Sequence, residues 1–196
     1  MKGERKKVGK QMEIYTQTYD SPIGEIYLTS DGQSLTGVYY SRREFEKKNS
    51  LLCQKKVDSP LFLALKRWLD AYFRGEQPEI DFALAPHGTH FQEKVWEEIR
   101  RIPYGQTVTY GEIAQKIAKE MGRPTMSAQA VGRAVGSNPI SIIIPCHRVI
   151  GKSGSVTGYG GGIDRKLALF ALEKVQASSY FVPKNIKEAR SFVNYE

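Results

Sequence analysis

A cysteine, a histidine and an arginine stand side by side at Cys146, His147 and Arg148, directly after Pro145. An unperturbed thiol has a pKa of about 8.5, so only a small fraction of it is thiolate at neutral pH. A neighbouring imidazole base can take the thiol proton and make the sulfur a nucleophile. The triplet therefore indicates nucleophilic chemistry, with the Cys146 sulfur attacking and His147 as its base.

This chemistry requires an unusual backbone around the triplet. Adjacent residues point to opposite faces of a strand and also diverge on a helix. Either the backbone turns sharply after Pro145, or a water bridges Cys146 and His147. The base would also need an orienting carboxylate, for which Glu173 has the right type but no supporting spacing. The alternative is structural, with Cys146 as a small buried hydrophobe and His147 as a hydrogen-bonded core residue.

The stretch GKSGSVTGYGGGIDRK (151–166) follows the triplet and is rich in glycine. Glycines around Tyr159 would let the backbone approach a ligand closely and present its amides. A phosphate-binding loop is not indicated, because the GK[ST] ending is missing. A flexible loop is the other interpretation.

The composition is that of a soluble globular protein, with 40% hydrophobic and 26% charged residues. No apolar run is long enough to span a membrane, and no apolar core follows the basic start as in a secretory signal. The two cysteines, Cys53 and Cys146, fit neither a disulfide framework nor a CxxC metal site. We therefore expect a reducing, cytoplasmic setting and no metal.

The net charge of +8 is concentrated in two parts of the chain. Residues 1–10 carry five basic and one acidic side chain, and residues 89–174 carry twelve basic and seven acidic ones. Residues 11–88 are slightly acidic, with nine basic and eleven acidic side chains. A local positive field suits a polyanion such as nucleic acid, although many proteins of this charge bind nothing anionic.

The first half of the chain predicts a small sheet and one helix. Residues 12–19, 23–30 and 35–40 are rich in β-branched and aromatic residues and are separated by turn signals, which is typical of an antiparallel meander. Apolar residues recur at helical spacing over 59–75. The loop-like stretch 75–88 marks the boundary to a second lobe.

The second half predicts helices with capping signals. Thr89 and Thr109 each stand three residues before a Gln or Glu, as in a capping box, and Ser127 can cap a third helix. A turn at Gly122 between the last two helices gives the pattern of a helix-turn-helix. The second helix of this helix-turn-helix, AQAVGRAVG (128–136), is nearly bare of side chains. Close packing on the core and the approach of a duplex explain this equally well.

At this point the sequence resembles a known family, the O6-alkylguanine-DNA alkyltransferases, also called methylated-DNA–protein-cysteine methyltransferases. NPISIIIPCHRVIG (138–151) is similar to the active-site signature of the family. Four further segments follow the family's order: PYGQTVTYGEIA (103–114), the AVG of the second helix of the helix-turn-helix, GYGGG (158–162) and RKLALFALE (165–173). The resemblance covers roughly residues 12–175 and is most specific at the signature.

The resemblance implies direct-reversal DNA repair. An alkyl group, such as methyl, would pass irreversibly from O6-alkylguanine, and from O4-alkylthymine, to Cys146. The resulting thioether has no good leaving group, so the protein would be consumed after a single turnover. His147 would deprotonate Cys146 through a water, and Glu173 would orient His147. Tyr110 would donate a proton to guanine N3. Asn138 would tie the second helix of the helix-turn-helix (128–136) to the active-site segment.

The resemblance also implies how the base and the DNA are held. Main-chain carbonyls at Cys146 and Val149 would accept from the guanine amine, the Gly160 amide would donate to O6, and Tyr159 would wall the pocket. The helix-turn-helix would bind double-stranded DNA through its minor groove, with the alkylated guanine flipped out. We expect a monomer with no cofactor, no metal and no membrane partner.

The DNA-facing residues implied by the resemblance lie in and just before the second helix of the helix-turn-helix (128–136). They are Ser127, Gln129, Ala130, Gly132 and Arg133. Gln129 stands where the family commonly has an arginine that fills the gap left by the flipped base. We hypothesise that Gln129 intercalates in its place and that Arg133, one turn later, contacts a phosphate.

We therefore predict an α+β fold: a small N-terminal antiparallel-sheet lobe followed by a mainly helical C-terminal lobe with a helix-turn-helix. The expected division is a basic disordered tip (1–11), an N-terminal α/β lobe (12–86), a DNA-binding and alkyl-acceptor domain (87–175) and a C-terminal extension (176–196) of unassigned role.

Three other functions compete with repair. A helix-turn-helix regulator could use Cys146 as a sensor of alkylation or oxidation. A cysteine hydrolase could use Cys146, His147 and Glu173, and it would turn over repeatedly. A non-catalytic relative could bind lesions without repairing them, although the retained cysteine argues against this.

Overall fold

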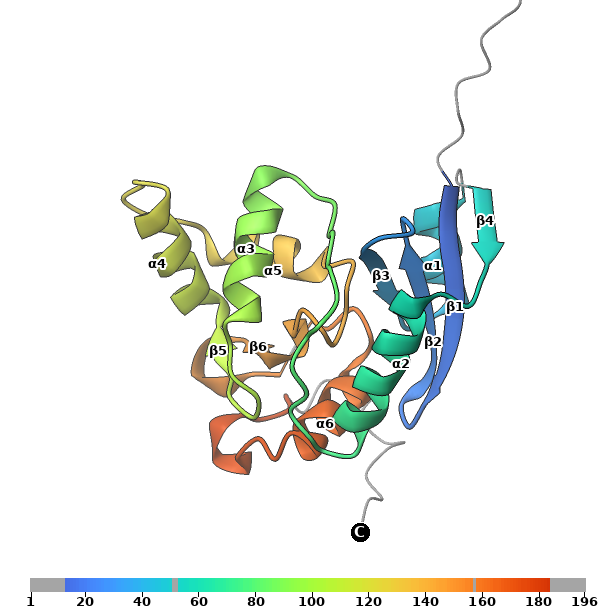
Figure 1. Cartoon of the computed structure of the whole chain (residues 1–196). Helices are drawn as coiled ribbons and strands as arrows, with labels where there is room; N and C mark the ends of the chain where they lie inside the picture. The colour runs from blue at the N-terminus through green and yellow to red at the C-terminus, as the bar shows by residue number, and fades with distance from the viewer. Residues whose placement is uncertain (1–12, 51–52, 157, 184–196) are drawn as a thin grey trace, which may run out of the picture.

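The computed structural model describes residues 13–50, 53–156 and 158–183 (Figure 1). Four strands form the N-terminal sheet in the order β3-β2-β1-β4: β1 (Glu13–Ser21), β2 (Gly24–Ser30), β3 (Leu35–Tyr39) and β4 (Cys53–Lys56). The antiparallel β1-β2-β3 meander confirms the prediction. The sequence did not predict β4, which pairs in parallel with β1.

Two helices accompany this sheet, α1 (Arg42–Asn49) and α2 (Pro60–Phe73). The predicted helix over 59–75 is confirmed as α2, whose N-terminus is capped by Ser59 accepting from the backbone of Phe62. Its buried face includes Leu65, Trp68 and Tyr72. The chain leaves α2 through Gly75, whose φ of +81° favours glycine.

The C-terminal lobe is mainly helical, as predicted. Its elements are α3 (His90–Arg100), β5 (Val108–Thr109), α4 (Tyr110–Glu120), α5 (Ala128–Gly136), β6 (Val149–Ile150) and α6 (Ile163–Leu172). Both capping boxes are confirmed, at the start of α3 and of α4, and Ser127 caps α5. The short parallel pairing of β5 with β6 was not predicted.

The bare helix α5 has two different faces. Val131, Ala134 and Val135 are buried, so part of the helix packs on the core. Gln129 and Arg133 are exposed on another face. Packing on the core is therefore confirmed for one side of α5, and the approach of a duplex to the other side stays a prediction.

The two lobes are joined through the edge strand β3. Leu35 donates to Ala83 O and accepts from Ala85 N, both at 2.9 Å, so the predicted boundary loop pairs with the sheet. Val38 N donates to Pro139 O at 2.8 Å, and Ser141 N lies 3.4 Å from Val38 O. One hydrophobic core runs through both lobes. The division of the chain near residue 87 stays a prediction.

The ends of the chain are only partly covered. The predicted tip (1–11) and residues 184–196 of the predicted extension lie outside the described residues. Phe181 pairs with the loop before it, accepting from Val156 N at 2.9 Å and donating to Gly154 O at 2.8 Å. No helix among the described residues is long and apolar enough to cross a membrane.

Candidate active site

Cys146 begins a single 3-10 turn, Cys146–Arg148, that follows Pro145. The Arg148 amide donates to Pro145 O at 2.9 Å and closes the turn. The backbone therefore turns sharply after Pro145, which is one of the two alternatives that the sequence left open. Cys146 is 7% exposed, and His147 is fully buried.

Asn138 connects the end of α5 with the reactive segment. Its Nδ2 donates to Ile144 O at 2.9 Å and lies 3.1 Å from the Cys146 sulfur. Its Oδ1 accepts from Ile140 N at 3.0 Å. The side chain thus fixes the backbone at Ile140 and Ile144, just before the turn, and supplies the sulfur with a donor.

Ile142 gives the reactive segment a strained bend. Its φ is +71°, which is uncommon for a β-branched residue and costs on the order of 1–3 kcal/mol. Hydrogen bonds at 2.9 Å from Ile143 N to Ser141 O and at 3.0 Å from Ile144 N to Ile140 O hold the bend. Burial of the Ile142 side chain offsets part of the strain.

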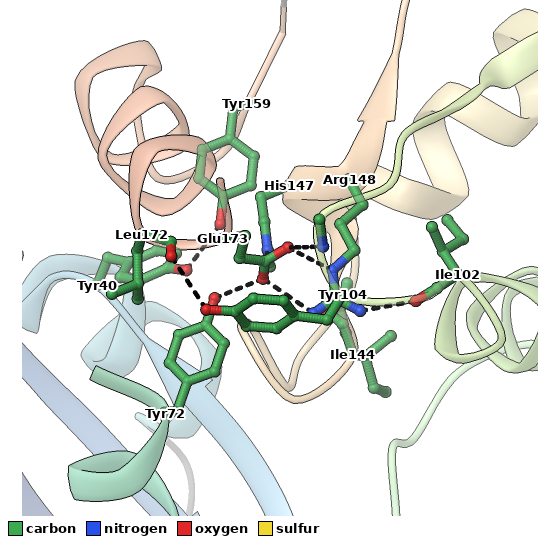
Figure 2. A network of polar contacts seen from close by, with 12 residues as sticks. Tyr40, Tyr72, Ile102, Tyr104, Ile144, His147, Arg148, Tyr159, Leu172 and Glu173 are labelled. Atoms are coloured by element: carbon green, nitrogen blue, oxygen red, sulfur yellow. Dashed lines mark hydrogen bonds and ion pairs between the residues drawn. The ribbon is translucent and has the colours of Figure 1, made fainter. Parts of the chain in front are cut away.

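His147 and Glu173 form a buried pair with fully covered side chains (Figure 2). His147 Nε2 and Glu173 Oε1 are 2.7 Å apart. An ionised carboxylate can only accept, so Nε2 carries the hydrogen and Nδ1 of the neutral ring is an acceptor. Nδ1 is buried and has no hydrogen-bond partner among the described residues. The pair therefore leaves a proton acceptor available near Cys146.

Glu173 caps the C-terminus of α6 and accepts five hydrogen bonds. Three donors contact Oε1: His147 Nε2 and Tyr72 OH, both at 2.7 Å, and Arg148 Nη2 at 2.9 Å. Two donors contact Oε2: Arg148 Nε at 2.8 Å and Gly105 N at 3.2 Å. Burial raises the pKa of Glu173, but His147 and Arg148 more than offset this and hold the pKa well below the usual carboxyl range. Glu173 is therefore ionised.

Arg148 is the counterion of Glu173, with Nε 2.8 Å from Oε2. Its side chain is only 11% exposed. Nη1 donates to Ile102 O at 2.6 Å, and the guanidinium lies 5.6 Å from the centre of the Tyr104 ring. The Tyr104 hydroxyl donates to Leu172 O at 3.1 Å (Figure 2). These contacts hold Arg148, and hence Glu173, in place.

The site keeps both reacting groups neutral at rest. Burial raises the pKa of the Cys146 thiol, against the lowering effects of the Asn138 hydrogen bond and the Lys166 charge. Burial lowers the pKa of His147, against the raising effect of Glu173. Lys166 is itself fully buried, with Nζ 2.5 Å from Val149 O, and burial lowers its pKa to about 8.

The pocket over Cys146 is small. Both lobes and the glycine-rich loop line it: Tyr40, Glu44, Tyr110, Val135, Gly136, Asn138, Ser141, Cys146, Gly158, Tyr159, Gly160 and Gly161. Its cavity of about 20 Å³ holds about one water. The Tyr40 and Tyr159 hydroxyls are 2.7 Å apart and join the two walls. A group larger than a water fits this cavity only if these walls separate.

The structure brings most of the predicted catalytic residues together. Cys146, Asn138, Tyr110, Tyr159 and Gly160 line the pocket, and His147 and Glu173 lie behind it. Burial and Cys146 raise the pKa of Tyr110, so its hydroxyl stays protonated. Val149 contributes a carbonyl that already accepts from Lys166, which leaves one lone pair.

The predicted DNA-facing residues lie outside the pocket, on α5. Gln129, Arg133 and Gly136 are spaced four and three residues apart, so they share one helix face. Gly136 lines the pocket mouth, and Gln129 and Arg133 are exposed. Ser127 is also exposed and Ala130 is half-buried, whereas Gly132 faces Tyr110.

Sequence reasoning missed three residues of the site, Tyr40, Tyr72 and Lys166. Apolar periodicity placed Tyr72 on the buried face of its helix, but nothing local indicates where its hydroxyl points. Lys166 lies within a segment that carries the resemblance, yet a lysine is usually exposed. In the described part of the chain, no three or more His, Cys, Asp or Glu side chains are grouped to hold a metal ion.

Comparisons with known proteins agree with this geometry. Two family models match in succession, the ribonuclease-like domain of 6-O-methylguanine DNA methyltransferase over residues 14–86 and its DNA binding domain over residues 90–175. The methylated-DNA–protein-cysteine methyltransferase of Mycobacterium tuberculosis H37Rv is 47% identical over 164 residues, which are 84% of this chain and 94% of that protein.

Solved structures match over a similar length. The crystal structure of the Mycobacterium tuberculosis O6-methylguanine methyltransferase has 46% identity and a TM-score of 0.70, and the match covers 84% of this chain and 94% of that one. The same organism's OGT in complex with DNA has 46% identity and a TM-score of 0.67, with coverage of 82% and 92%. The similarity therefore includes both lobes and the reactive segment.

Proposed function

Because this chain belongs to the family of methylated-DNA–protein-cysteine methyltransferases, we propose that it transfers alkyl groups from O6-alkylguanine, and from O4-alkylthymine, in DNA to its own Cys146, once per molecule. It is a methyltransferase of DNA repair, and DNA is its partner. The observation that carries the assignment of the acceptor is the buried Cys146 beside a His147–Glu173 pair whose Nδ1 is free to accept a proton.

The first step generates the nucleophile. His147 Nδ1 accepts the thiol proton of Cys146 through a water, and Glu173 stabilises the imidazolium that forms. The short distance between Nε2 and Oε1 supports this role, because it fixes the ring in the tautomer that leaves Nδ1 as the base. Asn138 and Lys166 stabilise the thiolate by hydrogen bonding and by charge.

The second step is an in-line displacement at the alkyl carbon. The bond from sulfur to carbon forms while the bond from carbon to O6 breaks, and the electron pair passes to the guanine. Tyr110 donates its hydroxyl proton to guanine N3, and the proton taken from the thiol restores the phenol. The thioether product has no good leaving group, so each molecule acts once.

The flipped base is held mainly by backbone. The carbonyls of Cys146 and Val149 accept from the guanine amine, and the exposed Gly160 amide donates to O6. Tyr159 walls the base after its contact with Tyr40 opens. Extrusion of the nucleotide costs a few kcal/mol, and less for a damaged base.

The helices α4 and α5 bind duplex DNA as a helix-turn-helix in the minor groove. The exposed face of α5 supports this, because its small residues let the groove approach closely up to the pocket mouth. Gln129 fills the gap in the stack, and Arg133 contacts a phosphate. Ser127, Ala130 and Gly132 complete the contact. The protein acts as a monomer, in the cytoplasm, where a reducing environment preserves a free thiol.

The test is the mass of the protein after incubation with a methylated oligonucleotide. A gain of one methylene on Cys146, which is absent in Cys146→Ala, is the expected result. An unchanged mass despite binding would favour a regulator and overturn the proposal. Repeated turnover of an ester or amide would favour a cysteine hydrolase instead.

A further inference from the structure

Tyr72 brings the N-terminal lobe into contact with the buried relay. It lies in α2 and is 2% exposed, and its hydroxyl donates to Glu173 Oε1 at 2.7 Å (Figure 2). The other donors to Glu173 are His147, Arg148 and Gly105, which all belong to the C-terminal lobe. The lobe without the reactive cysteine therefore supplies one of the five hydrogen bonds to this carboxylate.

Aromatic neighbours fix the direction of the hydroxyl. The Tyr72 ring stacks on Trp68, with centroids 5.3 Å apart and planes 8° from parallel, and the edge contact with Tyr104 spans 6.1 Å. A buried ring enclosed in this way cannot turn its hydroxyl away from Glu173. The hydrogen bond is thus a fixed part of the site.

The hydroxyl shares Oε1 with His147 and with Arg148. A donor to a carboxylate oxygen draws off negative charge that would otherwise act on the other donors at that oxygen. Burial and the charge of Glu173 raise the pKa of Tyr72 well above its ordinary value, so the hydroxyl remains a donor. Tyr72 therefore opposes the stabilisation of a proton on His147.

We propose that Tyr72 is a positioning residue for alkyl transfer, which acts through Glu173 and keeps His147 a neutral base. The inference rests on the proposed function, in which His147 takes the thiol proton. It gives the N-terminal lobe a part in the chemistry, since the hydroxyl acts on the base without touching the substrate.

Burial lowers the pKa of His147, and the charges of three groups modify it: Glu173 raises the pKa, whereas Arg148 and Lys166 lower it. Cys146 is the fourth group at the base, with which His147 exchanges a proton under the proposed function. Replacing Tyr72 by phenylalanine leaves all four in place and keeps the ring contacts. The change in the charge on Glu173 Oε1 is then the only electrostatic difference at the base.

The expected effect of Tyr72→Phe has a definite sign. Without the hydroxyl, Oε1 presents more negative charge to His147, and the pKa of His147 rises. Less neutral base is present at low pH, so the acid limb of the pH–rate profile moves to higher pH by about one unit. Alkyl transfer slows about tenfold on the acid limb, and much less on the alkaline side.

The experiment measures the rate of Cys146 alkylation by free O6-benzylguanine across the pH range in which histidine titrates. Tyr104→Phe is the matched control, because it removes a hydrogen bond to Leu172 O but none to Glu173. The control should keep the acid limb where the unmodified protein has it. Titration of the His147 ring by NMR reports the same shift without any reaction.

A uniform slowing of Tyr72→Phe at every pH, or an unchanged profile, would overturn the inference and leave alkyl transfer itself intact. Absence of transfer in the unmodified protein would instead overturn the proposed function. If Tyr72→Phe does not fold, 3-fluorotyrosine at position 72 replaces it. Its more acidic hydroxyl is a stronger donor and must move the acid limb to lower pH.

Discussion

Replacing Glu173 by glutamine tests how much the buried relay contributes to stability. The variant removes the charge that accepts five hydrogen bonds, and it leaves Arg148 buried without its counterion. Hydrogen bonds to a charged group contribute about 1.5–3 kcal/mol each, and breaking a buried ion pair costs about 3–5 kcal/mol. We expect a loss of about 3–5 kcal/mol, a large part of the total of about 5–15 kcal/mol.

The pH dependence of this loss follows from the depressed pKa of Glu173. A carboxyl whose folded pKa lies below its unfolded value of about 4.3 contributes stability fully above that value. The contribution is lost as pH falls through the lower, folded pKa. The difference between Glu173→Gln and the unmodified protein should therefore persist from neutral pH down to about pH 4 and shrink only below it.

Urea unfolding at a series of pH values measures both quantities. Glu97→Gln is the control, because its exposed pair with Arg101 should contribute at most about 1 kcal/mol. Equal unfolding midpoints for Glu173→Gln and the control would refute the reasoning. A difference that has already vanished near pH 5 would show that the pKa of Glu173 is not depressed.

Three further predictions concern DNA and the thiol. Gln129→Ala should weaken binding and repair of duplex DNA while sparing the reaction with free O6-benzylguanine; equal loss on both substrates would count against Gln129 as the intercalating residue. Lys166→Met should raise the pKa of Cys146, because it removes a positive charge that lowers it, and thiol alkylation by a small electrophile should then begin at higher pH. DNA binding should weaken steeply with salt, and Arg133→Gln should reduce the slope of log K against log salt by about one.

The sequence predicted what local hydrogen bonding determines. Thr89, Thr109 and Ser127 cap helices by accepting from the backbone amide three residues later, so their function is contained in a few adjacent residues. The turn after Pro145 was one of two alternatives that stereochemistry left. In these places a short segment carries all the information needed.

The elements and contacts that depend on residues far apart in the chain could not be predicted from the sequence. The four residues of β4 form a strand only because β1 lies beside them, and the polar sequence of α1 has little helical apolar periodicity. The partners Tyr72 and Glu173 are 101 residues apart, and Glu173 was assigned through a resemblance and not through spacing. The hydrogen bond between Val38 and Pro139 depends on the docking of two lobes, which no window of sequence contains.

The narrow cavity over Cys146 bears on how the protein survives until it is needed. Under the proposed function, in which each molecule acts once, the sulfur has to stay unreacted until a lesion is met, although a cell also contains disulfides and other electrophiles. With room for about one water, and with Tyr40 and Tyr159 joined across it, the site shields the sulfur from bulky reagents that do not open the wall. On this proposal, the supply of unreacted protein falls with the lesions that open the wall and not with exposure to bulky electrophiles.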